Sequence, residues 1–214
     1  MPQKPVRQRL NREVICAAAL ELAAESGSPD VSMRALGERL GVDATAVYRH
    51  FADKDDLMRA VGDRALAPAT KGFTTTDDPA DDVRRMCTGL RKALLKNQVG
   101  LIITSAGPTR NANELRITEV MLDAFLRAGM DPDDAARAYH VLIEYTVGSA
   151  SLDAPLSRNA KERKATYDTW RRDYRALPAE EYPAIHELVG HLYPSSDEVF
   201  AAGLSALIAQ LMPS

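Results

Sequence analysis

The residues of this sequence best placed to do chemistry are Thr45 and Arg49, four positions apart in the segment DATAVYRHF. In a helix this spacing puts both side chains on one face. An arginine can donate two hydrogen bonds to the edge of a guanine, and a threonine methyl can contact a thymine methyl. We therefore interpret Thr45 and Arg49 as candidates for reading DNA bases. The alternatives for Arg49 are a phosphate contact or simple solvation.

Two short helices joined by a tight turn would position this face. The sequence predicts one helix over Met33–Leu40 and another over residues 44–50, separated by Gly41-Val42-Asp43. Glycine tolerates the left-handed backbone that such a turn often needs. A shared core is predicted from Met33, Leu36, Leu40, Val42, Val47 and Phe51, which leaves the outer face of the second helix to Ala44, Thr45, Tyr48 and Arg49. This is helix-turn-helix geometry over about residues 32–51, in which the second helix enters the major groove.

This segment resembles the tetracycline-repressor (TetR) family of bacterial transcriptional regulators. The string LGV-x4-VYRHF-x2-K-x2-L, at this spacing, is very specific for that family. The matching residues, over about residues 10–66, are Ile15, Ala18, Ala19, Gly27, Ser32, Leu36, Leu40, Gly41, Val42, Val47, Tyr48, His50, Phe51, Lys54 and Leu57. One departure is Gly37, where members usually carry alanine. Helix propensity predicts that this glycine loosens the second helix by up to about 1 kcal/mol.

The resemblance implies that Tyr48 and Lys54 contact DNA phosphates, with His50 nearby. The chemistry agrees, because a phenol donates a hydrogen bond and an ammonium group at a helix start reinforces the anion-binding amides there. Tyr48 could instead be a core residue, and His50 could pack or cap a helix. Ser32 and Arg34 are candidates for contacts to the DNA backbone, although a simple N-cap is the favoured interpretation of Ser32.

Cap signals place several further helices. A first helix is expected over Arg12–Ser26, and Asp53 is expected to cap a fourth, with Asp56 as the partner in a capping box. The last helix is expected to open at Ser195, three residues before Glu198. No stretch alternates in the manner of a strand, so an all-α fold is predicted.

Pro68 and the Pro-, Gly-, Thr- and Asp-rich residues around it predict a domain boundary. We expect residues 1–66 to form a three-helix DNA-binding domain that contains the helix-turn-helix. Residues 67–214 are expected to form a helical ligand-binding and dimerisation domain.

An apolar cavity for a small lipophilic effector is expected among the central helices of the second domain. Candidates for its lining are Ile102, with its neighbours Leu101 and Ile103, and Met121, Phe125, His140, Tyr145 and Trp170. For each residue taken singly, a place in the core is the favoured interpretation. The resemblance further implies that the effector releases the protein from its DNA operator.

A homodimer on a palindromic operator is also implied, since one short helix reads few base pairs. Family members pair through their last two long helices. The corresponding apolar stripes here provide the interface candidates Leu142, Thr146, Phe200, Leu204, Leu207 and Leu211. These stripes could instead be intramolecular core.

Bulk properties exclude some classes. The net charge of −3 does not by itself indicate a nucleic-acid binder, so charge has to be read locally. No apolar run is long enough for a membrane span and no signal peptide is recognised, so a cytoplasmic location is expected. Cys16 and Cys87 have apolar neighbours and are expected to be buried free thiols.

No enzyme motif, cofactor motif or metal site is expected. His186 and His191 superficially suggest a zinc motif, but their spacing of five turns the two imidazoles about 140° apart on a helix. The main alternative to an effector-released repressor is a ligand-independent activator or architectural DNA-binding protein. Thermal-shift screening of lipophilic compounds with an operator-binding assay would separate the two.

Overall fold

The computed structural model describes residues 9–26, 28, 30–97, 107–153 and 160–213, and within these ranges every regular element is a helix. This confirms the predicted all-α fold. In chain order the helices are α1 (Arg12–Ser26), α2 (Met33–Leu40), α3 (Ala44–Tyr48), α4 (Lys54–Thr70), α5 (Pro79–Asn97), α7 (Ala112–Arg127), α8 (Pro132–Asp153), α9 (Ala160–Arg175), α10 (Pro183–Leu188) and α11 (Ser196–Leu211). None of the helices in the described ranges is long and apolar enough to cross a bilayer.

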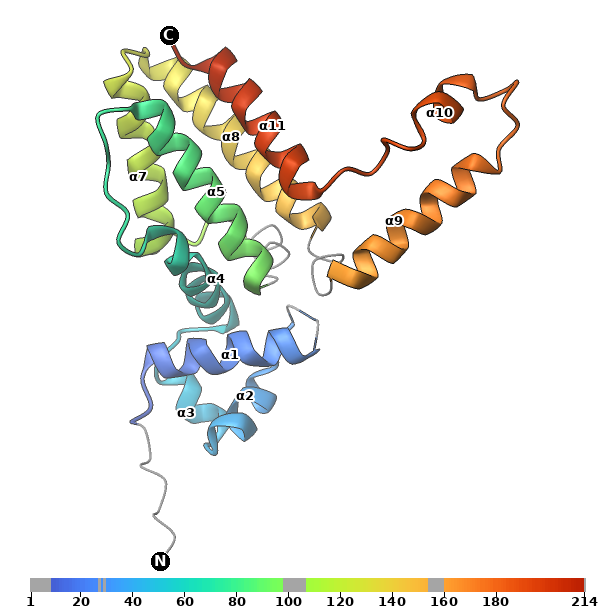
Figure 1. Cartoon of the computed structure of the whole chain (residues 1–214). Coiled ribbons are helices and arrows are strands. Elements are labelled where there is room, and N and C mark those ends of the chain that lie inside the picture. The colour runs from blue at the N-terminus through green and yellow to red at the C-terminus, as the bar shows by residue number, and fades with distance from the viewer. Residues whose placement is uncertain (1–8, 27, 29, 98–106, 154–159, 214) are drawn as a thin grey trace, which may run out of the picture.

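Helices α1 to α3 and the first turns of α4 form a small head around their own core, at the bottom of Figure 1. Ile15, Leu36, Val47, Phe51 and Leu57 are almost completely buried there. The predicted core of the two short helices is thus confirmed, with Leu40 and Val42 only partly buried at its edge. The head has the three-helix arrangement that the sequence predicts.

Helix α4 runs without interruption from the head into the rest of the molecule (Figure 1). Pro68, around which the sequence predicts a domain boundary, lies inside the last turn of this helix. Proline costs the helix one amide donor, but the chain still closes a further turn, in which the Lys71 amide donates to the Ala67 carbonyl at 2.9 Å. The boundary expected between residues 66 and 67 therefore falls within a helix.

Helices α5, α7, α8 and α11 pack around a second, larger core (Figure 1). Four of the residues predicted to form a dimer interface, Leu142, Thr146, Phe200 and Leu204, are buried in this core and at most 4% exposed. They offer no free surface to a partner, so the apolar stripes of α8 and α11 are intramolecular core here. Leu207 and Leu211 are partly buried and pack against the same core.

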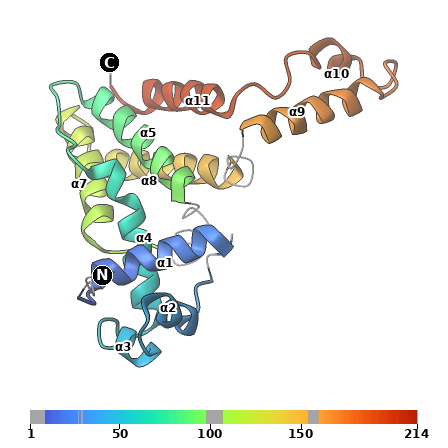
Figure 2. The same ribbon diagram turned by 60° about the horizontal axis from the view of Figure 1, so that its bottom comes forward.

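Helices α9 and α10 form an arm that projects away from the body in both views (Figures 1 and 2). The Arg171 guanidinium ties the arm together by donating to the carbonyl oxygens of Leu192 and Tyr193, both at 2.8 Å. Trp170 packs beside Tyr193, with ring centroids 5.1 Å apart, and is 37% exposed. The arm is thus held together by its own polar and aromatic contacts.

The helix caps follow the predictions with one difference. Ser195 and Glu198 form the complete capping box at the start of α11. At α4, Asp53 accepts the Asp56 amide at 2.6 Å, but the Asp56 carboxylate turns to the Ala52 amide. The predicted α4 capping box is therefore only half present.

Both cysteines are free and buried, as predicted. Burial raises the pKa of each thiol, Cys16 and Cys87, to about 11, so both stay protonated at neutral pH.

Candidate nucleic-acid interface and ligand cavity

One face of α3 is anchored in the core and the opposite face is open to solvent. Val47 is fully buried, whereas Thr45 and Arg49 are exposed and Tyr48 is 49% exposed. Ala44 is partly buried at the start of the helix. The structure therefore brings Thr45, Tyr48 and Arg49 together on one accessible face, and Tyr48 is not a core residue.

The start of α3 is fixed by its cap. The Asp43 carboxylate accepts the Thr45 amide at 2.8 Å, and hydrogen bonds from Thr45 hold the pKa of Asp43 below its usual range. Gly41 has the left-handed backbone expected in the turn, with φ of 65°. The turn that aims α3 is thus set by local interactions that the sequence indicates.

Gly37 has a role that helix propensity does not predict. A Cβ atom at this position would lie 2.8 Å from the Val42 carbonyl oxygen and 3.2 Å from the Ala44 nitrogen. Both atoms belong to the backbone, so no side-chain adjustment relieves the contact. Rather than merely loosening α2, the glycine permits the close approach of α2 to the turn and to α3.

Arg12 positions the far end of α3, a role that the sequence analysis missed. Its guanidinium donates to the His50 carbonyl oxygen at 2.5 Å, pairs with the Asp56 carboxylate at 3.1 Å, and lies 4.1 Å from the centre of the Phe51 ring. The hydrogen bond from Arg12 lowers the pKa of Asp56. His50 itself is partly buried. In the sequence, Arg12 is marked only as the first residue of the predicted helix Arg12–Ser26.

The remaining DNA-binding candidates lie around α3. Lys54, at the first position of α4, forms an ion pair with the exposed Asp30. Ser32 caps α2 by accepting the Ala35 amide at 3.1 Å. Arg34 is largely exposed and pairs with Glu38 one turn away at 3.2 Å. An exposed pair of this kind is weak, so Lys54 and Arg34 can exchange their partners for phosphates at little cost.

A cavity of about 630 Å³ lies between α4, α5, α7 and α8, and we call it the central cavity. Its walls are mostly apolar, with two carboxylates and one phenol. They comprise Leu66, Leu90, Leu94, Gly107, Pro108, Glu114, Ile117, Tyr139, Ile143, Glu144, Val147 and Gly148. This volume is in the range of sites that enclose a drug-sized molecule.

None of the five predicted ligand-binding residues that the structure describes is in this lining. Met121 and Phe125 are fully buried in the core, and His140 is exposed beside Tyr139. Trp170 is on the arm, and Ile102, like Leu101 and Ile103, lies outside the described residues. Within the described chain, Met121 and Phe125 on α7 therefore pack in the core and not around the cavity.

The residues that do line the cavity left one signal in the sequence. Tyr139, Ile143 and Val147 recur every four residues on α8, directly beside the buried stripe of Leu142 and Thr146. A second row of apolar residues widens the apolar face of a helix and indicates that it meets more than one neighbour. Sequence alone does not tell whether the extra width faces a helix or a cavity.

Asp63 links the DNA-binding side of the molecule to the cavity wall. It is 8% exposed on α4, and its carboxylate accepts the amides of Asn113 at 3.0 Å and Glu114 at 2.9 Å. It also accepts the Asn113 side-chain amide at 2.8 Å and the Thr109 hydroxyl at 3.3 Å. Asp63 thus caps α7 from α4, immediately beside Glu114 in the cavity wall.

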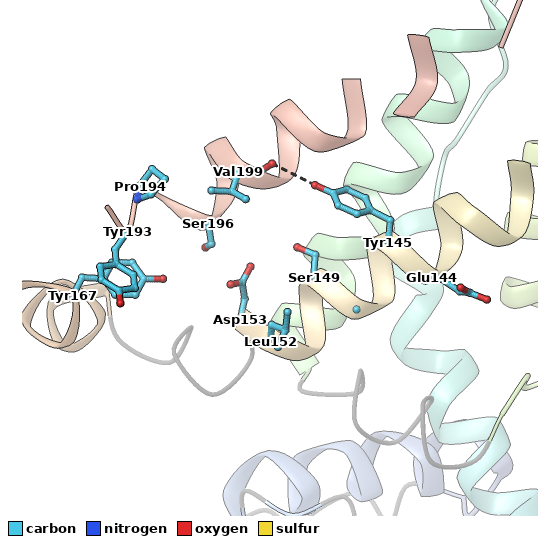
Figure 3. Close-up of a pocket in the computed structure, with 11 residues that line it drawn as sticks. Glu144, Tyr145, Ser149, Leu152, Asp153, Tyr167, Tyr193, Pro194, Ser196 and Val199 are labelled. Carbon is cyan, nitrogen blue, oxygen red and sulfur yellow. Dashed lines mark hydrogen bonds between the residues drawn. The ribbon is translucent and has the colours of Figure 1, made fainter. Parts of the chain in front are cut away.

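A second hollow of about 560 Å³, the side cavity, lies between α8, α11 and the arm (Figure 3). Tyr145 lines it and donates to the Phe200 carbonyl oxygen at 3.1 Å. The buried Arg91 guanidinium donates to Asp153 and to Asp197, each at 2.5 Å, and to Ser149 at 3.3 Å. Asp153 therefore shares the positive charge of Arg91 with Asp197.

His186 and His191 do not form a metal site. The His186 Nε2 atom lies 2.6 Å from the Leu177 carbonyl oxygen. Across the described ranges, no group of three histidine, cysteine, aspartate or glutamate residues is arranged to hold a metal ion.

A helix-turn-helix head joined through one continuous helix to a helical body with an apolar cavity defines a class: one-component transcriptional regulators. Residues 15–61 match the model of bacterial regulatory proteins of the tetR family, and residues 73–212 match the tetracyclin repressor-like C-terminal domain. The chain belongs to the tetracycline-repressor family and is a DNA-binding transcriptional regulator.

Similar proteins span nearly the whole chain. Tetracycline repressor protein class C of Escherichia coli is 30% identical over 95% of this chain and 91% of its own length. An HTH-type transcriptional regulator of Saccharopolyspora erythraea is 27% identical over 86% of this chain and 78% of its own length. The structure of ActR from Streptomyces coelicolor, in complex with actinorhodin, superposes with a TM-score of 0.81 over 95% of this chain and 97% of that one. At 24% identity this last likeness establishes the fold.

Proposed function

We propose that this regulator is a repressor that binds a palindromic operator as a homodimer and leaves it when a small lipophilic molecule fills the central cavity. The observation that carries the DNA-binding part is the two-sided α3, with Val47 buried and Thr45, Tyr48 and Arg49 accessible. A helix exposed on one side only can enter a major groove while the head keeps its core.

In this proposal some of the exposed residues contact DNA phosphates and others contact the bases. Tyr48 and Lys54 hold phosphates and provide affinity for any sequence, as do Arg34 and Ser32 at the start of α2. Thr45 and Arg49 contact base edges, and the small Ala44 lets the helix lie deep in the groove. His50 helps to position α3 through its carbonyl oxygen, which accepts a hydrogen bond from Arg12.

Release is proposed to start at the central cavity because that cavity touches α4. Leu66 of α4 lines it, and Asp63 of the same helix caps α7 next to Glu114. A ligand that binds better to one position of α7 relative to α4 will change the position of the head. The complex of ActR with actinorhodin supports the idea that this fold accommodates a small organic molecule.

Dimerisation is proposed through the outer faces of α8 and α11, since their inner faces are already buried. On α11 the outer face carries Val199, Ala202, Ala206 and Ala209, all exposed. Two such faces can approach closely because alanine side chains are small. A two-fold dimer would place two copies of α3 on successive turns of the same side of a duplex.

Selection of bound sequences from a random DNA pool tests the DNA-binding proposal, with a palindromic consensus as the expected result. Lys54→Ala should weaken binding to every sequence and lower the salt dependence by about one unit of slope. Arg49→Ala should relax the preference at particular base pairs. Lys71→Ala and Arg116→Ala, which remove exposed charges elsewhere, serve as controls. A uniform loss of affinity in Arg49→Ala, with the consensus unchanged, would remove its base-reading role.

The effector proposal is tested by screening lipophilic compounds for thermal stabilisation and then for release of the selected operator. A stabilising compound that dissociates the complex supports the repressor. Stable DNA bending by a protein that no compound releases would favour the architectural alternative.

A further inference from the structure

The wall of the central cavity combines apolar surface with negative charge. Two of its lining residues, Glu114 and Glu144, are carboxylates, and none of its described lining residues is a lysine, arginine or histidine. Most of the remaining wall is aliphatic, as at Leu90 and Ile143. The cavity therefore offers an apolar enclosure with a negative potential.

Of these two carboxylates, Glu114 is partly buried and held by hydrogen bonds, whereas Glu144 is exposed at the edge of the cavity. The Glu114 carboxylate accepts the Arg110 amide at 3.0 Å and the Thr118 hydroxyl at 3.1 Å. The Thr118 hydroxyl also lies 2.8 Å from the Tyr139 hydroxyl. In the part of the chain that the structure describes, neither Glu114 nor Glu144 takes part in an ion pair within 4.0 Å. Asp63 adds a third unpaired carboxylate next to this wall.

The side cavity provides an internal comparison. Its lining carries the carboxylate of Asp153, which shares the buried Arg91 with Asp197, and that of Glu144. Glu144 borders both cavities, and in Figure 3 its side chain points away from Ser149 and Asp153. Glu114 lines the central cavity and not the side cavity, and unlike Asp153 it has no ion pair among the described residues.

We infer that the central cavity takes an amphiphilic organic cation, whose charge lies against Glu114 and Glu144 and whose apolar body fills the aliphatic walls. Glu114 is partly buried beside apolar side chains, so a cation in the cavity would compensate its charge, and here a ligand would supply that cation. The ring of Tyr139 adds a favourable surface for a cation. This inference rests on the proposed function only in taking the central cavity as the effector site.

The phenol of Tyr139 fits this role. Burial raises its pKa, so the ring stays neutral at physiological pH and adds no charge of its own. An anion of the same size would face Glu114 and Glu144 without any described basic side chain in the wall to receive it. Charge, rather than shape, should therefore decide which lipophilic ligands bind.

Tetraphenylphosphonium and tetraphenylborate are suitable probes because they share size and shape and differ in the sign of their charge. Calorimetric titration of the full-length protein should show at least tenfold tighter binding of the phosphonium. Glu114→Gln and Glu144→Gln should each reduce phosphonium affinity several-fold, and their effect should shrink at high salt. Glu119→Gln on the exposed surface of α7 is the matched control and should leave binding unchanged. Melting temperatures of all variants report whether the fold is intact.

Preferential binding of the phosphonium that both cavity variants weaken supports the inference. Equal or tighter binding of tetraphenylborate, a preference that survives both substitutions, or no binding of either probe overturns it. Each of these negative results leaves the proposed function standing if a neutral compound still releases the operator. Failure of every compound to release the operator would instead reject the proposed function.

Discussion

At Gly37, helix propensity and the space around the residue have opposite effects on the stability expected for an alanine substitution. Helix propensity alone predicts that Gly37→Ala stabilises α2 by about 1 kcal/mol. The added Cβ would lie 2.8 Å from the Val42 carbonyl oxygen, so the turn before α3 must move. Since backbone shifts from overpacking typically cost about 1–3 kcal/mol, we expect a net loss of stability and weaker operator binding. Chemical denaturation and operator titration measure the two effects.

Gly148→Ala is the control for this substitution. Gly148 also lies inside a helix, and a Cβ atom there would meet nothing within 4 Å. It should therefore stabilise the protein by up to about 1 kcal/mol, as propensity predicts. If Gly37→Ala proved as stabilising as Gly148→Ala, the close approach of α2 to the turn would not matter for the fold.

Residue by residue, the sequence predicts local roles better than tertiary ones. Thr45 and Arg49 are exposed and Val47 is buried because helical periodicity alone sorts these faces. The clamp that Arg12 forms on the end of α3 spans 38 residues, and no local pattern indicates it. The same holds for Gly37, whose value depends on a backbone atom of the following turn.

At the scale of elements, α4 is the part on which communication between head and cavity depends. Asp63→Asn keeps the shape of the side chain but replaces one acceptor oxygen by an amide that faces hydrogen-bond donors. Leaving buried partners of this kind unsatisfied costs about 1–3 kcal/mol, so the variant should be less stable by that order. We also expect a ligand to bind nearly as before while releasing the operator less effectively. The ratio of the operator affinities measured with and without ligand gives the effectiveness of release.

Asp77→Asn, in the exposed loop before α5, is the matched control and should change neither stability nor release. If Asp63→Asn lost stability but kept the full effect of the ligand on operator affinity, the cap on α7 would be purely structural. The signal would then have to reach α4 through the apolar contacts at Leu66.

The helices themselves were largely predictable, because their caps and periodicity are local. At Pro68, which the sequence marks as part of a domain boundary, a single missing hydrogen bond in the last turn of α4 does not end the helix. The stripes of α8 and α11 that were expected at a dimer interface are buried in the core of the protomer. A stripe such as Leu142 and Thr146 shows that a face is buried, but not which neighbour covers it.

At the scale of the whole molecule, the outer face of α11 is the feature that the isolated chain leaves uncovered. Val199 is 52% exposed, and Ala202, Ala206 and Ala209 extend the same apolar face along the helix. If two copies pair through this face, Ala206→Glu will place a charge in a closely packed apolar contact. We expect the variant to be monomeric in sedimentation experiments and to bind the operator at least tenfold more weakly, because a single head remains.

A monomeric Ala206→Glu variant could reflect lost pairing or lost folding. The free energy of unfolding of the monomer distinguishes the two. Ala206 is exposed in the protomer, so the Ala206→Glu chain should keep its helical content and resist denaturant as an intact monomer. Leu126→Glu places the same charge on an exposed apolar position of another helix, α7, and should leave the dimer intact. A dimer that persists in Ala206→Glu, with operator affinity unchanged, would move the interface to another surface, of which the projecting arm of α9 and α10 is the most exposed.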